Sequence, residues 1–231
     1  MRKYRHLYFD LDRTLWDYET NASEALAEVF DKFGLALVFG TIGNFRDAFT
    51  KYNNALWSQF QQGKIKKETI RVRRFELSLL QYATKNKALA GHINDLFLHT
   101  LTQKAGLVPY VSEVLDYLKS KSYHLYILTN GFTKIQEVKM KSAGIDAYFE
   151  KMFTSENTRS YKPKRGIFEH ALKSVNALKV ESLMIGDDME ADIIGARNFG
   201  IDQVYFNPGK TEHHEKVTYE ITDLMGLKGI L

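Results

Sequence analysis

The stretch HLYFDLDRTLWD, residues 6–17, contains the feature that decides the fold. A short apolar and aromatic run, typical of a buried strand, ends in Asp10 and Asp12, which lie two positions apart. Side chains at positions i and i+2 of a strand point the same way, so these two carboxylates would repel each other. Another part of the molecule must therefore supply positive charge that offsets the repulsion.

The composition of the 231 residues is that of an ordinary globular protein, with 44% hydrophobic and 26% charged residues. This length is enough for one large domain, or for a core domain with a smaller one. The chain has no cysteine, which excludes disulfides and thiolate chemistry, and we expect a cytoplasmic protein. We find no apolar stretch of transmembrane length and no secretory signal, so we expect no membrane association. The formal net charge of +4 favours anionic substrates, but the basic residues are scattered and form no nucleic-acid-binding motif.

Short apolar runs that end in polar residues predict a parallel sheet. From residue 110 onward they alternate with helical patterns, which is typical of βαβ units and a Rossmann-like, doubly wound α/β fold. Ligands of such sheets bind at the carboxyl ends of the strands. The predicted strands are 6–10, 124–130, 150–156, 182–188 and 202–207, and the predicted helices are 110–121, 132–143, 165–177 and 189–199.

The segment between the first two strands is too long for a single crossover helix. It contains successive helical patterns at 22–34, 42–63, 67–83 and 90–103. We therefore predict a core domain formed by residues 1–16 and 107–231, with a helical domain inserted at 17–106.

Chemically informative side chains occur at the predicted strand ends. Several carboxylates that converge on one crevice are unfavourable without cations, and an all-oxygen ligand set suits Mg²⁺. The pattern predicts a magnesium site with room for an anion beside a hydroxyl and a lysine. The residues are Asp10 and Asp12, Thr129 and Asn130, Lys162, and Asp187, Asp188 and Asp192.

These residues resemble the four motifs of the haloacid dehalogenase (HAD) superfamily of phosphohydrolases. DxDxT is Asp10 to Thr14, the strand that ends in Thr is YILTN, the lysine before proline is Lys162-Pro163, and GDxxxxD runs from Gly186 to Asp192. All four occur in the family's order.

The resemblance implies a role for each residue. Asp10 would attack phosphorus and also bind Mg²⁺, together with Asp187 and the backbone carbonyl of Asp12. The carboxyl of Asp12 would protonate the leaving alcohol and later deprotonate water, and repulsion from its neighbour would favour a proton on it. Lys162, Thr129 and the amides near Asn130 would hold the phosphoryl oxygens, with Lys162 also counted as catalytic.

Three further residues have supporting roles in this interpretation. Asp192 would orient Lys162 or a water on the metal, and Asp188 is either an outer group of the metal site or a helix N-cap. The family's first motif usually has Gly where this chain has Arg13, which we expect to affect the adjacent turn rather than the chemistry.

The inserted helices resemble the C1-type cap of the superfamily's first subfamily, and several short motifs resemble its pyrimidine 5′-nucleotidase branch. These motifs are TNGFT at 129–133, FQQGKI at 60–65 with RRF at 73–75, and KPKRGIF at 162–168. The resemblance implies a phosphatase for small phosphate esters, with nucleoside monophosphates favoured, in a monomer or homodimer. Trp16, Tyr18 and Arg74 are candidate substrate contacts. For each residue alone the structural role is the stronger interpretation, because aromatic residues at helical spacing are usually core and Arg74 can pair with a carboxylate of the cap.

Two alternatives remain open at this point. Within the fold, the chain could be a sugar-phosphate or phosphoglycolate phosphatase. In a different class, it could be a non-catalytic phospho-accepting or ligand-binding domain, since receiver domains also gather acidic residues, Thr, Lys and Mg²⁺ on a doubly wound sheet. Receivers are about half this length and lack the insertion.

Overall fold

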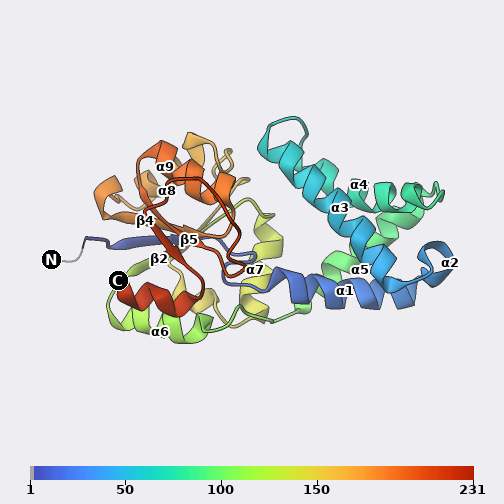
Figure 1. Ribbon diagram of the computed structural model, residues 1–231, viewed down its shortest axis with the longest axis horizontal. Coiled ribbons are helices and arrows are strands. Elements are labelled where there is room, and N and C mark those ends of the chain that lie inside the picture. Colours follow the sequence, from blue (N-terminus) through green and yellow to red (C-terminus); the bar gives the residue numbers. More distant parts are fainter. Residues whose placement is uncertain (1–2) are drawn as a thin grey trace. The chain divides into compact units, whose positions relative to one another are not determined.

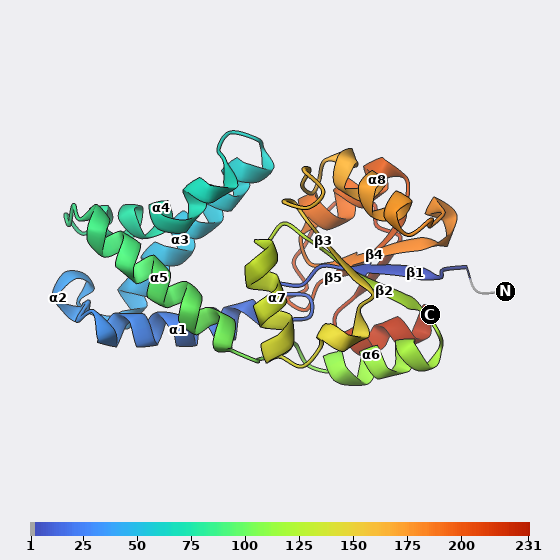
Figure 2. The same cartoon turned by 180° about the vertical axis from the view of Figure 1, so that it is seen from behind.

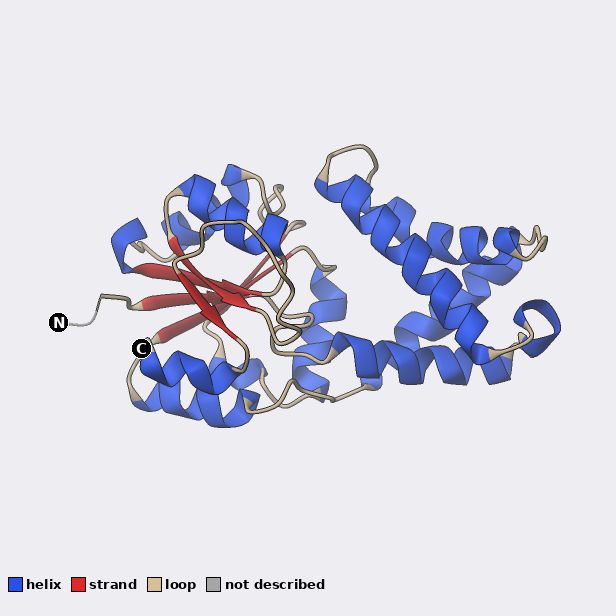
Figure 3. Ribbon diagram, viewed as in Figure 1, coloured by secondary structure: helices blue, strands red, loops and turns tan. Residues whose placement is uncertain are grey.

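The computed structural model describes residues 3–231 and contains two compact units. One unit comprises the chain up to Tyr18 together with Ala105–Leu231, and the other comprises Glu19–Lys104. The strands belong to the first unit, and the second is built from helices (Figure 3). Within residues 3–231, no helix combines the length and apolarity needed to cross a lipid bilayer.

The first unit is built on a parallel sheet in the order β3-β2-β1-β4-β5-β6. The order reverses at β1, which defines the switch point of a doubly wound sheet and confirms the predicted fold class. The sequence did not predict β6, because three residues are too few to show a periodicity. The strands are β1 (His6–Phe9), β2 (His124–Thr129), β3 (Lys151–Thr154), β4 (Ser182–Gly186), β5 (Asp202–Phe206) and β6 (Tyr219–Ile221).

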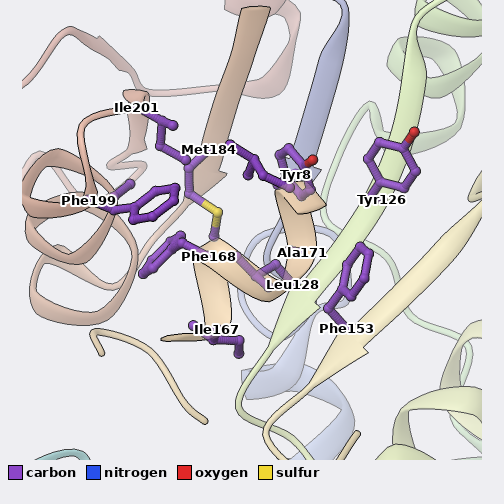
Figure 4. Close-up of a cluster of buried hydrophobic side chains, with 12 residues drawn as sticks. Tyr8, Tyr126, Leu128, Phe153, Ile167, Phe168, Ala171, Met184, Phe199 and Ile201 are labelled. Carbon is purple, nitrogen blue, oxygen red and sulfur yellow. The ribbon is translucent and has the colours of Figure 1, made fainter. Parts of the chain in front are cut away.

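Helices cover both faces of the sheet, which explains why its central strands are continuously apolar. On one face the register aligns Tyr8 with Tyr126 and Met184, and these side chains pack with residues of α8 (Arg165–Ser174) and α9 (Gly195–Phe199) (Figure 4). On the other side lie α6 (Val111–Ser120) and the C-terminal 3₁₀ helix Leu224–Gly229 (Figures 1 and 2). The core therefore fixes the ends of β1, β2 and β4 relative to one another.

Two helices of this unit carry residues that matter below. Helix α7 (Thr133–Ser142) follows β2. Where the sequence predicts one helix over 189–199, the structure has a π-helical turn, Met189–Ile194, followed by α9. Short 3₁₀ helices, Asp146–Tyr148 and Lys179–Glu181, complete the connections.

The helical unit buries its own aromatic core. Rings of Phe39, Phe45, Phe49, Phe75 and Phe97 contact one another with centroid distances of 4.9–6.4 Å. The side chains of Thr41 and Asn86 cap the N-termini of the third and fifth helices. The helices are α1 (Tyr18–Lys32), α2 (Ala36–Phe39), α3 (Ile42–Gln61), α4 (Lys67–Gln81) and α5 (Lys87–Gln103).

Candidate active site

The parallel sheet brings the predicted site residues to one edge. Asp10 directly follows β1, Thr129 ends β2, and Asp187 directly follows β4. β1 lies between β2 and β4, so the three residues follow adjacent strands at their carboxyl ends. Lys162 reaches the same edge from the loop between β3 and α8.

Lys162 lies at the centre of a buried charge cluster. Its Nζ is 2.5 Å from Asp10 Oδ1 and 2.6 Å from Asp192 Oδ1, and its side chain is only 2% exposed. Burial alone would lower the pKa of Lys162, but the two carboxylates raise it above its usual value. The lysine is therefore charged, and it offsets the repulsion that the paired aspartates of the sequence predict.

The three acidic groups at this edge are suited to hold a cation. Asp10, Asp187 and Asp192 each offer a carboxylate oxygen, and these oxygens lie within 4.8 Å of one another. Both oxygens of Asp192 are already bonded, one to Lys162 and the other to the backbone N–H of Asp188 at 3.1 Å. Asp10 and Asp187 are therefore the better candidate ligands, and hard oxygen donors of this kind suit Mg²⁺.

Burial raises the pKa of all three carboxyls. The pKa of Asp187 is raised to about 7 by burial and by Asp10, and Thr14 Oγ1 donates to its Oδ1 at 3.0 Å. The pKa values of Asp10 and Asp192 are also raised by burial, with Lys162 acting in the opposite direction. One lysine does not neutralise this set, so a bound cation would relieve the remaining repulsion.

Asn130 fixes the loop that carries Lys162. Its Nδ2 donates to the Lys162 carbonyl at 2.9 Å, and its Oδ1 accepts from the Lys162 N–H at 2.8 Å. The sequence had suggested that amides near Asn130 hold phosphate, and the structure gives its side chain this additional task. Thr129 Oγ1 accepts from the N–H of Gly131 at 3.0 Å.

The environment of Asp12 differs from the one expected from the sequence. Lys139 Nζ is 2.5 Å from Asp12 Oδ1, and Gln136 Nε2 donates to Asp12 Oδ2 at 2.7 Å. Burial alone would raise the pKa of Asp12, but Lys139 and Gln136 lower it below its usual value. The expectation that repulsion from Asp10 favours a proton on Asp12 is therefore wrong for this arrangement, because a lysine outside the four motifs contributes the larger effect.

Sequence reasoning did not find Gln136 and Lys139. They lie three residues apart on α7 and therefore on one helix face, directly after the strand that ends in Thr129. That spacing is a weak signal, because polar residues at i and i+3 usually mark a solvated face. Here both side chains are buried.

Asp188 and Arg13 occupy special backbone positions. Asp188 Oδ1 accepts from the N–H groups of Glu190 and Ala191 at 3.0 and 2.9 Å, so it caps the π-helical turn, as one of the two predictions for it stated. Arg13 has φ of 67°, the left-handed conformation that explains why glycine suits this position. Its guanidinium lies 4.5 Å from the ring centroid of Tyr18.

The candidate substrate contacts are less open than expected. Trp16 is fully buried, with Lys139 Nζ 4.1 Å from its ring centroid. Arg74 is buried in the helical unit, where it donates to Asn53 Oδ1 at 3.1 Å and lies near the rings of three phenylalanines. Tyr18 is only partly buried, and it is the most accessible of the three candidates.

This fold and this arrangement of residues define a class of protein. The sequence matches the family of haloacid dehalogenase-like hydrolases over residues 7–206, and the chain belongs to that family. The resemblance seen in the four motifs is thereby confirmed.

Individual relatives are similar over nearly the whole chain. The pyrimidine 5′-nucleotidase PynA of Streptococcus pneumoniae is 31% identical over 94% of this chain and 91% of its own length. The pyrimidine 5′-nucleotidase YjjG of Escherichia coli is 27% identical over 99% of this chain and 98% of its own. A crystal structure of the HAD-hydrolase YfnB of Bacillus subtilis bound to magnesium superposes with a TM-score of 0.91 at 26% identity, covering 99% of each chain.

Proposed function

We propose that the protein is a Mg²⁺-dependent phosphomonoesterase that acts through an aspartyl-phosphate on Asp10. The observation that carries this proposal is the buried cluster in which Lys162 bonds both Asp10 and Asp192 at the carboxyl end of the sheet, beside Asp187. A nucleophile, a fixed cation and a set of oxygen ligands are the parts that phosphoryl transfer requires.

The residues of the chain divide the reaction into two steps. In the first, a carboxylate oxygen of Asp10 attacks phosphorus, the bond from phosphorus to the ester oxygen breaks, and Asp12 gives a proton to the leaving alcohol. Lys139 and Gln136 favour the ionised form of Asp12 in the protein alone, and the negative charge of a bound phosphate ester beside Asp12 would raise its pKa and favour the protonated form that this step needs. In the second, Asp12 takes a proton from water as the water oxygen bonds to phosphorus and the bond to Asp10 breaks. Lys162 and Thr129 hold the phosphoryl oxygens in both steps.

Asp10, Asp187 and the backbone carbonyl of Asp12 would hold Mg²⁺. When bound, the metal supplies positive charge to the phosphoryl oxygens and to the carboxylates around them. The magnesium-bound structure of the relative YfnB supports the choice of metal.

Nucleoside monophosphates are the proposed substrates. The support is the full-length similarity to two pyrimidine 5′-nucleotidases, PynA and YjjG. We propose that the inserted helical unit, Glu19–Lys104, selects the leaving group, and that Tyr18, the most accessible of the three candidate substrate contacts, takes part.

The test is release of inorganic phosphate from a panel of esters: p-nitrophenyl phosphate, UMP, dUMP, sugar phosphates and phosphoglycolate. We expect Mg²⁺-dependent turnover that EDTA abolishes and that Asp10→Asn lowers by about 10⁴-fold or more. The exposed Asp223→Asn is the matched control and should retain full activity.

The ester panel distinguishes a nucleotidase from another phosphatase, and a phosphatase from a non-catalytic domain. Faster turnover of sugar phosphates than of UMP and dUMP would reject the nucleotidase assignment and retain the phosphatase. Inactivity on every ester, with Asp10→Asn indistinguishable from the unmodified protein in ligand binding, would favour a non-catalytic domain.

A further inference from the structure

Two side chains of α7 hold the carboxylate of Asp12 from both of its oxygens. Lys139 Nζ lies 2.5 Å from Oδ1, and Gln136 Nε2 lies 2.7 Å from Oδ2. A carboxylate bonded at both oxygens has one preferred rotamer, since any rotation about its side-chain torsions breaks at least one bond. Neither α7 residue belongs to the four motifs.

The position of Lys139 is unusual for a lysine. Its side chain is only 4% exposed, and its ammonium packs 4.1 Å from the ring centroid of Trp16. Burying a lysine costs desolvation and side-chain entropy, which the bond to Asp12 and the aromatic face must offset. Lys134 and Lys141, on the same helix, are exposed. The burial of Lys139 is therefore specific to its position beside Asp12.

Gln136 connects Asp12 to the residue that ends β2. Its Nε2 donates to Asp12 Oδ2 and also to Thr129 Oγ1, at 3.0 Å, and its side chain is buried. A single amide group thus fixes the distance between the proposed acid–base group and the proposed phosphate-binding hydroxyl.

The sequence leaves space for this amide at Gly131. A Cβ added at Gly131 would lie 2.3 Å from Gln136 Nε2, far closer than any non-bonded contact allows. Any other residue at position 131 would therefore displace the Gln136 side chain, so the glycine and the glutamine depend on each other.

We propose that Gln136 and Lys139 are positioning residues for Asp12, which hold its carboxylate at the place where it meets the leaving-group oxygen of a phosphate ester. This inference rests on the proposed phosphatase function and adds two residues to it. Thr129 would hold a phosphoryl oxygen, and Gln136 is hydrogen-bonded to both Thr129 and Asp12. Gln136 would therefore fix the position of the Asp12 carboxylate relative to the bound phosphoryl group.

The alternative is an ion pair that only stabilises the fold. Both alternatives predict some loss of stability when Lys139 is removed, so a stability measurement does not distinguish them. The dependence of kcat/KM on the leaving group does distinguish them. An alkoxide leaves slowly without a proton donor, whereas p-nitrophenolate leaves readily without one, and kcat/KM covers the steps up to cleavage of the ester bond. A misplaced Asp12 therefore lowers kcat/KM for alkyl esters much more than for p-nitrophenyl phosphate.

The experiment compares Gln136→Met and Lys139→Met with Lys141→Met, the control on the exposed face of α7. Each is assayed on p-nitrophenyl phosphate and on the alkyl ester of the panel that the unmodified protein hydrolyses fastest. We expect kcat/KM for the alkyl ester to fall about tenfold to a hundredfold in the first two variants and to change little for p-nitrophenyl phosphate. Inhibition by inorganic phosphate should be unchanged in Lys139→Met and Lys141→Met, which leave the hydrogen bond to Thr129 intact.

A second comparison tests whether the α7 residues act through Asp12. In an Asp12→Asn background, adding Lys139→Met or Gln136→Met should cause no further loss on the alkyl ester, because the group that they position is already disabled. If Lys139→Met does not fold, Gly131→Ala displaces Gln136 and should reproduce the leaving-group effect, and Lys139→Arg should retain part of the activity.

Two results would overturn the inference while leaving the phosphatase intact. One is an equal loss on both esters, and the other is a full additional loss in the Asp12→Asn background. Inactivity of the unmodified protein on every ester would instead reject the proposed function itself.

Discussion

At the scale of single residues, each of the two aspartates that follow the first strand is matched by its own lysine. Lys162 bonds Asp10 and Lys139 bonds Asp12, each at 2.5 Å. Both lysines are buried, and each comes from a different connection of the sheet. The repulsion that the i, i+2 spacing creates is thus offset locally for each carboxylate, before any metal binds.

Replacing Lys162 by methionine tests the first of these pairs. Asp10 and Asp192 would be left buried without a counter-charge, and we expect a loss of about 3–5 kcal/mol in the free energy of unfolding at pH 8. Removing the lysine removes the effect that lowers the pKa of both carboxyls, so they take up protons more readily in the folded state than in the unfolded state. Stability of the variant therefore falls as pH rises, and the loss at pH 5 should be smaller than at pH 8.

Denaturant unfolding at the two pH values measures this difference. The exposed Lys164→Met is the matched control two residues away. A loss for Lys162→Met that is the same at both pH values would contradict the account of the charge cluster.

The part of the site that lies at strand ends was predictable from the sequence. Asp10, Thr129 and Asp187 follow apolar runs, and the topology of a parallel sheet brings such positions together. Gln136 and Lys139 were not predictable, because a helix pattern does not say which polar side chain turns inward. Their burial depends on tertiary contacts with Asp12 and Trp16, which lie more than 100 residues earlier in the chain.

At the scale of elements, the connection from β4 to α9 determines where Asp192 lies. The π-helical turn Met189–Ile194 places the Asp192 carboxylate against Lys162 and against the end of β4. Wider turns of this kind are rare and occur often at functional sites. The sequence predicted a single helix here, because the apolar spacing of a π turn followed by an α-helix is not distinguishable over so few residues.

Gly186 is the position at which this packing is tightest. A Cβ at Gly186 would lie 2.1 Å from Asp192 Oδ2. We therefore expect Gly186→Ala to displace Asp192 and to lower the free energy of unfolding by about 1–3 kcal/mol. Displacement of Asp192 would also break its bond to Lys162, so activity should fall as well. Thermal unfolding together with phosphate release from p-nitrophenyl phosphate measures both effects.

The matched control is Gly91→Ala, within α5, where an added Cβ meets nothing within 4 Å. In this control the free energy of unfolding should rise by about 0.5–1 kcal/mol, because alanine has a higher helix propensity than glycine, and activity should be unchanged. Full activity in Gly186→Ala would contradict the role assigned to the turn.

At the scale of the whole molecule, the chain combines a sheet unit that carries the chemical groups with a helical unit inserted after the first strand. The presence of two units was predictable, because 118 residues separate Asp10 from Thr129 and helical patterns fill most of this interval. Each unit has its own core, aromatic in the helical one. The substrate was not predictable in the same way, since no sequence pattern shows that two of the candidate substrate contacts, Trp16 and Arg74, are buried.

Metal binding should stabilise the molecule in a pH-dependent manner. Burial and Asp10 raise the pKa of Asp187 to about 7, so this carboxyl is protonated in the folded protein at pH 5 and largely ionised at pH 8. Without metal, a raised carboxyl pKa lowers stability as pH rises from about 4 to 7, because the folded state binds the proton more tightly than the unfolded state. Mg²⁺ binds the ionised form and opposes this loss.

The measurement is the midpoint of thermal unfolding with Mg²⁺ and with EDTA at pH 5 and pH 8. We expect a larger upward shift by Mg²⁺ at pH 8. In Asp187→Asn the shift should be strongly reduced at both pH values. An equal shift in that variant would show that the metal binds elsewhere.

The proposed reaction passes through a phosphoryl group on Asp10, and the Asp12→Asn variant should make this intermediate observable. With p-nitrophenyl phosphate, whose leaving group needs no proton, this variant should still transfer the phosphoryl group but hydrolyse the intermediate slowly. Acid-quenched protein should therefore release one equivalent of p-nitrophenol in a burst and carry one phosphoryl group, which mass spectrometry of the peptide containing residues 6–17 locates on Asp10. Turnover by Asp12→Asn without a burst and without phosphorylated protein, or a phosphoryl group on any other residue, would contradict the account.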